Sequence, residues 1–495
     1  MAAIVKKNLP LVAVFVGLLF VRQDLGVDIW FMLNNGQYIM AHGFPHVEPF
    51  TIHKNLDYIV QQWLTCVIFR QVYDLFGYAG LVWLARIAGA VILWGYYRLC
   101  VAVSGGNRTL SAMLTALVGT MVCLIFVYPR PVIFSTPIFI AEVWLLEQAA
   151  AKPRCLWLLP LLALLLVNFH AAMFPMFFVL MLPYLAASVR LKALDAYVVT
   201  GFNLPLKILF MAAAASVAVA FCNPYGSEAL LYGINSYGYA AINRLVGEMH
   251  PLTVNTPLFI IPAAFLLFLL PAYGRKSVPL QYVLLTLGTA YMAMAAIRSE
   301  LLFLVFGTLG AAYVLREKKF AASVGGNIRR RLTVALTVFI VAVLVLTVGK
   351  KDNYRYEEYY YGEIYKPAAD YLASLPEGTE NIRLMSEYNS GSYFEFRGIK
   401  CYIDSRAEVF LKVNNHRKNI FHEYSALYWG DLPYRKFLWR YDFTHVFVAD
   451  NNPIFYQAMA TDPDWELVFE FDYGRNKNNP KIGRIYRAKK VRSEE

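Results

Sequence analysis

The sequence has few charged residues and lacks the short motifs of common soluble enzymes. Only 16% of its 495 residues are charged, whereas about a quarter are charged in a typical globular protein. It has no glycine-rich phosphate loop, no Gly-x-Ser-x-Gly nucleophile motif and no His-Glu-x-x-His zinc motif. The six cysteines show no Cys-x-x-Cys spacing, and so indicate neither a disulfide framework nor a zinc site.

Apolar residues take the place of the missing charge. They make up 58% of the chain, which exceeds what one soluble core buries, and they gather in runs. The runs lie near residues 8–22, 79–101, 109–128, 132–149, 156–173, 175–189, 206–222, 256–273, 279–297, 300–315 and 332–349. We therefore predict a mainly α-helical polytopic membrane protein of about 11 spans. A single soluble domain, a disordered chain, a fibrous protein and a one-span anchor are excluded.

The net charge of +12 belongs to the apolar part of the chain. Residues 1–349 hold 24 Lys and Arg against 12 Asp and Glu, whereas residues 350–495 hold 22 of each. With the N-terminus in the cytoplasm, 17 basic residues fall on inner connections and six on outer ones. This asymmetry follows the positive-inside rule and argues against a nucleic-acid partner. We expect a multi-pass plasma-membrane protein with an extracytoplasmic C-terminal domain.

Two units are expected along the chain. Residues 1–350 form the transmembrane domain, with long outer loops at 23–78 and 223–255. Within the first loop, residues 29–40 and 58–76 have amphipathic patterns typical of helices at the membrane surface. Residues 351–495 are predicted to form an extracytoplasmic α/β domain. Its expected strands are 382–387, 400–404, 445–449, 465–471 and 483–487, and its expected helices include 365–374 and 453–460.

Ionisable and amide residues mark the outer ends of the predicted spans. Charged side chains within a bilayer are costly unless they face a cavity or a partner. The set comprises Asp24, Asp28, Arg130, Asn168, His170, Glu248, His250, Arg298 and Glu300. All of them fall on the outer side in the predicted topology, which indicates one site at the outer surface. Glu142 falls within a predicted span instead, and its burial demands a partner or a proton.

Each of these residues also has a simpler structural interpretation. Asp24 and Asp28 could act as a general base or as metal ligands, or could cap a helix in a solvated loop. Arg130 and Arg298 could bind phosphate or anchor the chain at the headgroups. His170 could carry a proton or bind substrate, or pack with an ordinary hydrogen bond.

Several segments, in order, carry a resemblance to a known family. They are residues 28–39, 43–51, 62–64, 130–131, 168–170, 223–226, 388–393 and 402–406, with Glu248 and Arg298. Together they resemble a bacterial and archaeal family of membrane proteins in the GT-C glycosyltransferase superfamily. The chain departs from the family pattern at Phe31, Met32, Glu48 and Gln62, where the family has Trp, His, Asp and an acid.

The resemblance implies an enzyme similar to protein O-mannosyltransferases and aminoarabinose transferases. Such an enzyme takes a sugar from a polyprenyl-phosphate lipid and passes it, with inversion, to a glycan, lipid or protein acceptor. The implied catalytic acid is Asp28, with Asp24 and Glu48 as further candidates. The implied phosphate-binding residues are Arg298 and Arg130, and the substrate-binding residues are His170, Asn168, Glu248, Trp30 and Trp63. The metal requirement stays open, with a divalent cation as the candidate cofactor.

Two other functions fit the same composition. A lipid-linked sugar flippase would also need polar residues among apolar helices, although no internal repeat is evident. A non-catalytic protein of cell-envelope glycan assembly would explain the departures at Met32 and Gln62.

Overall fold

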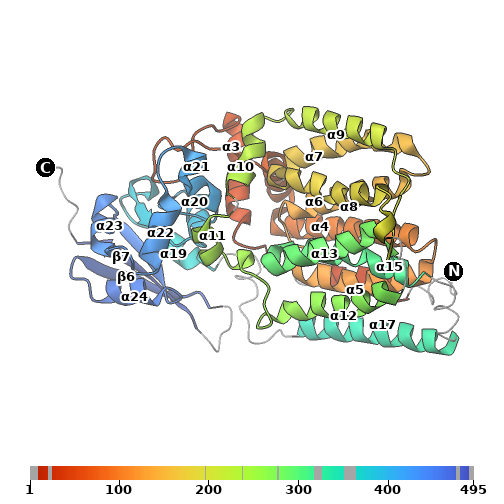
Figure 1. Cartoon of the computed structure of the whole chain (residues 1–495). Coiled ribbons are helices and arrows are strands. Elements are labelled where there is room, and N and C mark those ends of the chain that lie inside the picture. Colours follow the sequence, from red (N-terminus) through yellow and green to blue (C-terminus); the bar gives the residue numbers. More distant parts are fainter. Residues whose placement is uncertain are drawn as a thin grey trace.

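The computed structural model describes residues 9–20, 25–194, 197–236, 238–275, 278–316, 326–349, 364–474 and 480–489. Figure 1 shows a bundle of roughly parallel helices on one side and a smaller domain with a β-sheet on the other. Helices α3 (Ile29–His42), α10 (Ser227–Ser236) and α11 (Ala240–Leu245) lie between these two parts. The chain is therefore mainly helical, with a sheet-containing C-terminal domain, as the sequence predicts.

Every predicted apolar run coincides with helix in the bundle. The helices are α2 (Leu9–Phe20), α4 (Trp63–Val103), α5 (Arg108–Ile125), α6 (Val132–Gln148), α7 (Leu159–His170), α8 (Phe174–Ser188), α9 (Leu206–Ala220), α12 (Ile260–Arg275), α13 (Leu280–Ala295), α14 (Glu300–Leu302), α15 (Leu309–Val314) and α17 (Gly326–Gly349). A π-helical turn, Phe303–Gly307, joins α14 to α15.

The structure does not support eleven membrane spans. Five of its described segments are long and apolar enough to cross a membrane: Trp63–Val103, Arg108–Ile125, Pro153–Ser188, Pro257–Gly274 and Ile297–Val314. The apolar helices α9 and α13 have only 15 and 16 residues. At 1.5 Å per residue they extend roughly 22–24 Å, less than the ~30 Å of a bilayer core. Length and composition therefore support five spans among the described residues, fewer than the eleven predicted.

Element α4 contains two helices that join at Gly77, whose φ of +60° and ψ of −153° are not helical. These two helices correspond in position to the predicted helix at 58–76 and the predicted span at 79–101. A positive φ is readily adopted by glycine, so the chain can change direction there. The first part of α4 thus belongs with α3 at the end of the bundle.

Helix α3 packs closely on the first part of α4. A side chain at Gly36 would place its Cβ 2.2 Å from the carbonyl oxygen of Cys66, so only glycine allows this approach. The helix ends at Gly43, whose φ of +82° lets its N–H bond the carbonyl of Ile39. In Figure 1, α3 runs across the bundle axis rather than along it, which matches the predicted helix at 29–40.

The C-terminal domain contains a mixed five-stranded sheet in the order β4-β3-β5-β7-β6. Its strands are β3 (Arg383–Met385), β4 (Lys400–Cys401), β5 (His445–Ala449), β6 (Trp465–Asp472) and β7 (Ile482–Ala488). β3 is parallel to β4 and β5, whereas β7 is antiparallel to β5 and β6. The helices are α19 (Lys366–Ala373), α20 (Gly391–Phe396), α21 (Lys412–Asn415), α22 (Ile420–Tyr428), α23 (Tyr434–Arg440) and α24 (Pro453–Ala460). All five predicted strands are present.

The C-terminal domain is anchored to the first loop by aromatic packing. Trp30 is 1% exposed, and its ring centroid lies 4.8 Å from that of Tyr393 and 4.9 Å from that of Phe396. Beside this cluster, the Ser392 hydroxyl donates to the carbonyl of Val27 at 3.1 Å. Burial of a large aromatic side chain stabilises such a contact by several kcal/mol. This packing fixes α20 of the domain against α3 of the membrane part.

Candidate functional site

A cavity of about 310 Å³ lies where the end of the bundle meets the C-terminal domain. Its walls come from segments far apart in the sequence. Asp28, Arg130, Glu248 and Arg298, all predicted as site residues, line it together. The structure therefore brings into one cavity four residues that the sequence placed at the outer ends of predicted spans.

Arg130 forms the centre of the charged wall. Its Nη2 lies 2.6 Å from Oδ2 of Asp28, and its Nη1 lies 2.5 Å from Oε2 of Glu248. The guanidinium carbon sits 5.1 Å from the centre of the Tyr128 ring, a cation–π contact that helps fix its orientation. Its Nε is buried and bonds no described residue, so one donor of the guanidinium is unused in this arrangement.

Asp28 occupies the N-cap position of α3, yet its carboxylate makes no capping hydrogen bond. The structural interpretation of this residue as a helix cap is therefore wrong. Its carboxylate faces Arg130 instead, with a side chain that is 21% exposed. Burial raises the pKa of Asp28, and the Arg130 cation opposes that rise. A carboxylate that is buried but still reached from a cavity is suited to accept a proton.

The C-terminal domain supplies the rest of the lining, including Tyr388, Ser405, Arg406 and Glu408. Burial raises the pKa of the Glu408 carboxyl, and the Arg298 cation acts against that rise. The Tyr388 hydroxyl donates to the carbonyl of Ser405 at 2.8 Å, which holds two lining segments together. The cavity is thus a shared product of both parts of the chain, and sequence reasoning missed the role of Glu408.

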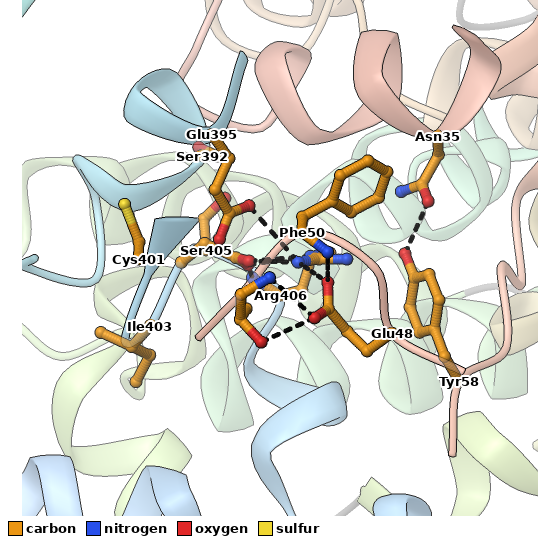
Figure 2. A network of polar contacts seen from close by, with 12 residues as sticks. Asn35, Glu48, Phe50, Tyr58, Ser392, Glu395, Cys401, Ile403, Ser405 and Arg406 are labelled. Carbon is orange, nitrogen blue, oxygen red and sulfur yellow. Dashed lines mark hydrogen bonds and ion pairs between the residues drawn. The ribbon is translucent and has the colours of Figure 1, made fainter. Parts of the chain in front are cut away.

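Arg406 is buried in a cluster of carboxylates (Figure 2). Its Nη2 lies 2.8 Å from Glu48 and 3.4 Å from Glu395, and it also pairs with Asp404. Glu48 further accepts hydrogen bonds from the Thr51 backbone and hydroxyl, at 2.9 and 2.6 Å. These contacts link the first loop to the C-terminal domain. Glu48 does not itself line the described cavity, although its partner Arg406 does, and its predicted role in the site stays a prediction.

Four other predicted site residues lie outside the described lining of the cavity. Trp30 is buried in the aromatic cluster that holds the two parts of the chain together. The indole of Trp63 donates to Oδ1 of Asn168 at 2.8 Å, so these two satisfy each other. Nδ1 of His170 lies 3.2 Å from the Ser135 hydroxyl. Each side chain thus meets a neighbouring element instead of the cavity.

The other expectations concern Asp24, two positions that depart from the family pattern, and a metal ion. Asp24 lies outside the described residues. Gln62, where the family resemblance expects an acid, lines the cavity, whereas Met32 is fully buried. Among the described residues, no three His, Cys, Asp or Glu side chains are grouped so that they could hold a metal ion.

A comparison with models of protein families finds no match to this chain, and a comparison with curated proteins finds none either. The GT-C resemblance therefore stays a prediction that depends on the motifs in the sequence. The geometry of the cavity is the remaining basis for a functional assignment.

Proposed function

We propose that the chain is a membrane glycosyltransferase that moves a sugar from a polyprenyl-phosphate donor to an acceptor at the end of the bundle. One observation carries the proposal: the Asp28 carboxylate and the Arg130 guanidinium, 2.6 Å apart, line a cavity together with Arg298. A base, two cations for a phosphate and nearby helices of membrane-spanning length are the parts that such a transfer needs.

In the proposed reaction, Asp28 accepts the proton of an acceptor hydroxyl. The hydroxyl oxygen then attacks the anomeric carbon of the donor sugar from the face opposite the phosphate. The bond between that carbon and the phosphate oxygen breaks, and polyprenyl phosphate leaves with the electron pair. Attack from the opposite face inverts the anomeric carbon, and the charge left on the phosphate is stabilised by cations beside it.

The Arg130 ion pairs are compatible with donor binding. Two carboxylates, Asp28 and Glu248, share one guanidinium, so a phosphate can take the place of one and leave the other in contact. Arg is well suited to this exchange because its planar fork binds two oxygens at once. In this proposal Arg130 and Arg298 bind the phosphate, and release from Arg130 frees Asp28 to act as the base.

A second candidate is a non-catalytic protein of glycan assembly. Its support is Gln62, which presents an amide to the cavity where the resembling family has an acid. An amide can hydrogen-bond a sugar hydroxyl but cannot take its proton at neutral pH. Turnover of a donor lipid by the purified chain would exclude this candidate.

The test uses the full-length chain in liposomes with a panel of polyprenyl-phosphate-linked sugars labelled on the sugar. Transfer to added acceptors and hydrolysis to free sugar are both measured. Asp28→Asn should lower the turnover of the active donor by at least about 100-fold, as expected for loss of a general base. Asp57→Asn is the matched control, because Asp57 lies in the same loop and pairs with His416 at 2.8 Å at the surface.

Two outcomes would contradict the proposal. One is an Asp28→Asn variant that inserts normally and keeps wild-type turnover. The other is movement of labelled donor lipid across the liposome with no transfer or hydrolysis, which would identify a flippase.

A further inference from the structure

A second depression, of about 510 Å³, lies on the surface of the C-terminal domain. It is formed by α21, the segment that follows it, α22 and the end of α23. Its charged lining consists of Lys412, Arg417, Lys418, Arg440 and Glu423, with His422 beside them. None of these residues takes part in the cavity at the end of the bundle.

The depression concentrates positive charge in a domain whose numbers of basic and acidic residues are equal. Residues 350–495 hold equal numbers of basic and acidic side chains, yet residues 411–422 contain three Lys or Arg and no acid. The one lining carboxylate, Glu423, pairs with Arg440 and accepts hydrogen bonds from the Tyr402 and Tyr441 hydroxyls. Its charge is therefore already engaged.

The remaining cations are exposed and have no described carboxylate as a partner. Lys412, Arg417 and Lys418 form no ion pair with any carboxylate in the part of the chain that the structure describes. Like charges that line one depression repel one another, and an anionic ligand would relieve that repulsion.

Two of these cations are positioned by neighbouring contacts. Nε of Arg417 donates to the carbonyl of Asn55 at 3.2 Å, and the Lys418 ammonium lies 5.5 Å from the centre of the Tyr441 ring. The backbone N–H of Asp57 also donates to the carbonyl of Asn415 at 3.3 Å. The first loop, which carries Asp28 toward the cavity, therefore also supports the basic depression.

We propose that this depression binds a polyanionic segment of the acceptor, a glycan that bears phosphate or carboxylate groups. The inference rests on the proposed function, because it names the acceptor class for that transfer. Lys412 opens α21, two residues after the end of the turn Ala407–Phe410, whose residues Ala407, Glu408 and Val409 line the cavity. The depression and the cavity wall are therefore connected by a short, continuous segment of the chain.

The location favours a soluble polyanion over a lipid headgroup. In Figure 1, α22 and α23 lie in the C-terminal domain, beyond α3 and away from the apolar helices of the bundle. A patch that binds headgroups would instead adjoin the ends of helices that enter the membrane.

The test measures binding by the purified full-length chain of two labelled probes, inorganic polyphosphate and oligogalacturonate, with neutral dextran as a third. The variant Lys412→Gln/Arg417→Gln/Lys418→Gln removes three cations of the depression. Lys400→Gln/Lys436→Gln/Lys481→Gln removes three exposed cations elsewhere in the same domain. We expect the first variant to bind a polyanion about tenfold more weakly and the second to change binding less than about twofold.

Three outcomes would overturn the inference. They are equal losses in both variants, absence of polyanion binding by the wild type, and a depression that binds anionic vesicles but no soluble polyanion. Asp28→Asn separates this inference from the proposed function, because it should lower transfer by at least about 100-fold and leave polyanion binding unchanged. If Asp28→Asn loses transfer but the wild type binds no polyanion, the proposed polyanion site is refuted and the proposed function is not. Unchanged transfer in Asp28→Asn would refute the proposed function and the acceptor role with it.

Discussion

Glu48 of the first loop and Arg406 of the C-terminal domain lie 2.8 Å apart in the interior, where their side chains are 0% and 4% exposed. The guanidinium also meets Glu395 (Figure 2) and pairs with Asp404. The Arg406 guanidinium therefore forms ion pairs with three carboxylates. Burial raises the pKa of Glu395 well above its ordinary value, and the Asp404 charge raises it further. A proton held on Glu395 would reduce the excess negative charge of the cluster.

Substitution of Arg406 should destabilise the chain strongly. Arg406→Gln leaves Glu48 and Asp404 buried without their cation, and removal of one partner from a buried pair costs about 3–5 kcal/mol. Thermal unfolding in detergent should show a lower midpoint, and limited proteolysis should release the C-terminal domain. Lys436→Gln, at an exposed site within the C-terminal domain, is the control and should change neither result. Equal midpoints for Arg406→Gln and wild type would show that the cluster does not hold the two parts together.

The aromatic contact at Trp30 should matter for stability and little for recognition of a sugar. Trp30→Ala removes a ring that packs on Tyr393 and Phe396, and such a loss in a core costs about 3–5 kcal/mol. We expect faster proteolysis between the two parts of the chain. Trp94→Ala, at a side chain that is 54% exposed on α4, should leave the proteolysis rate unchanged. If Trp30→Ala lowered donor affinity with no effect on proteolysis, Trp30 would be a substrate-binding residue after all.

Glu387 should make the stability of the C-terminal domain depend on pH. Burial raises the pKa of this carboxyl from 4.5 to about 8, against the opposing hydrogen bond that it accepts from the Ala449 N–H. Between those two pH values the folded chain holds a proton that the unfolded chain has lost. The stabilisation is therefore complete below pH 4.5 and declines, by roughly 1.4 kcal/mol per pH unit at most, as the pH rises to 8.

Glu387→Gln should remove that decline while its amide oxygen keeps the bond to Ala449. The unfolding midpoint of the variant relative to wild type should thus be higher at pH 8 than at pH 5. Glu466→Gln, whose carboxylate is 53% exposed and faces Arg487, is the control. A difference between Glu387→Gln and wild type that stayed constant from pH 5 to 8 would mean that Glu387 is ionised throughout.

Arg130→Lys tests whether the planar fork of Arg130 matters. A lysine ammonium keeps the charge but cannot meet Asp28 and Glu248 with two parallel donors. If the proposed transfer is correct, the KM for the donor lipid should rise about tenfold, which corresponds to about 1.4 kcal/mol. Arg244→Lys, at an arginine that stacks on Trp429 at 4.3 Å outside the described cavity lining, is the control. An unchanged KM in Arg130→Lys would assign donor binding to other cations.

Local patterns in the sequence predicted most of the secondary structure. The strand at 445–449 and the helix at 453–460 have their predicted limits, because alternating or periodic apolar residues end there at turn-forming residues. The predicted strand at 400–404 is reduced to two residues, Lys400–Cys401. Beyond it the Tyr402 N–H still donates to the Leu384 carbonyl of β3 at 2.9 Å, but the chain then leaves the sheet, and where a strand ends depends on contacts that local patterns do not contain.

The site could be predicted only in part. The sequence indicated four of the lining residues, because a charged side chain at the end of an apolar run is energetically unfavourable unless it faces a cavity or a partner. They are Asp28, Arg130, Glu248 and Arg298. The sequence did not single out Glu408 and Arg406 in this way, because charged residues of both signs are common throughout the C-terminal domain. Their place beside the cavity depends on how residues 388–409 dock against α3, which is a long-range contact. The only hint was the motif at 402–406, and that hint came from a resemblance.

The shared walls of the cavity set the order in which the protein can become functional during synthesis. Residues 28, 130, 248 and 298 leave the ribosome before residues 405–409, and translation of the intervening hundred or so residues takes on the order of ten seconds. A nascent chain whose helices are already in place would still have an open, incomplete pocket. Binding of the proposed donor in this cavity would therefore require residues 405–409 to be synthesised and packed against the first loop.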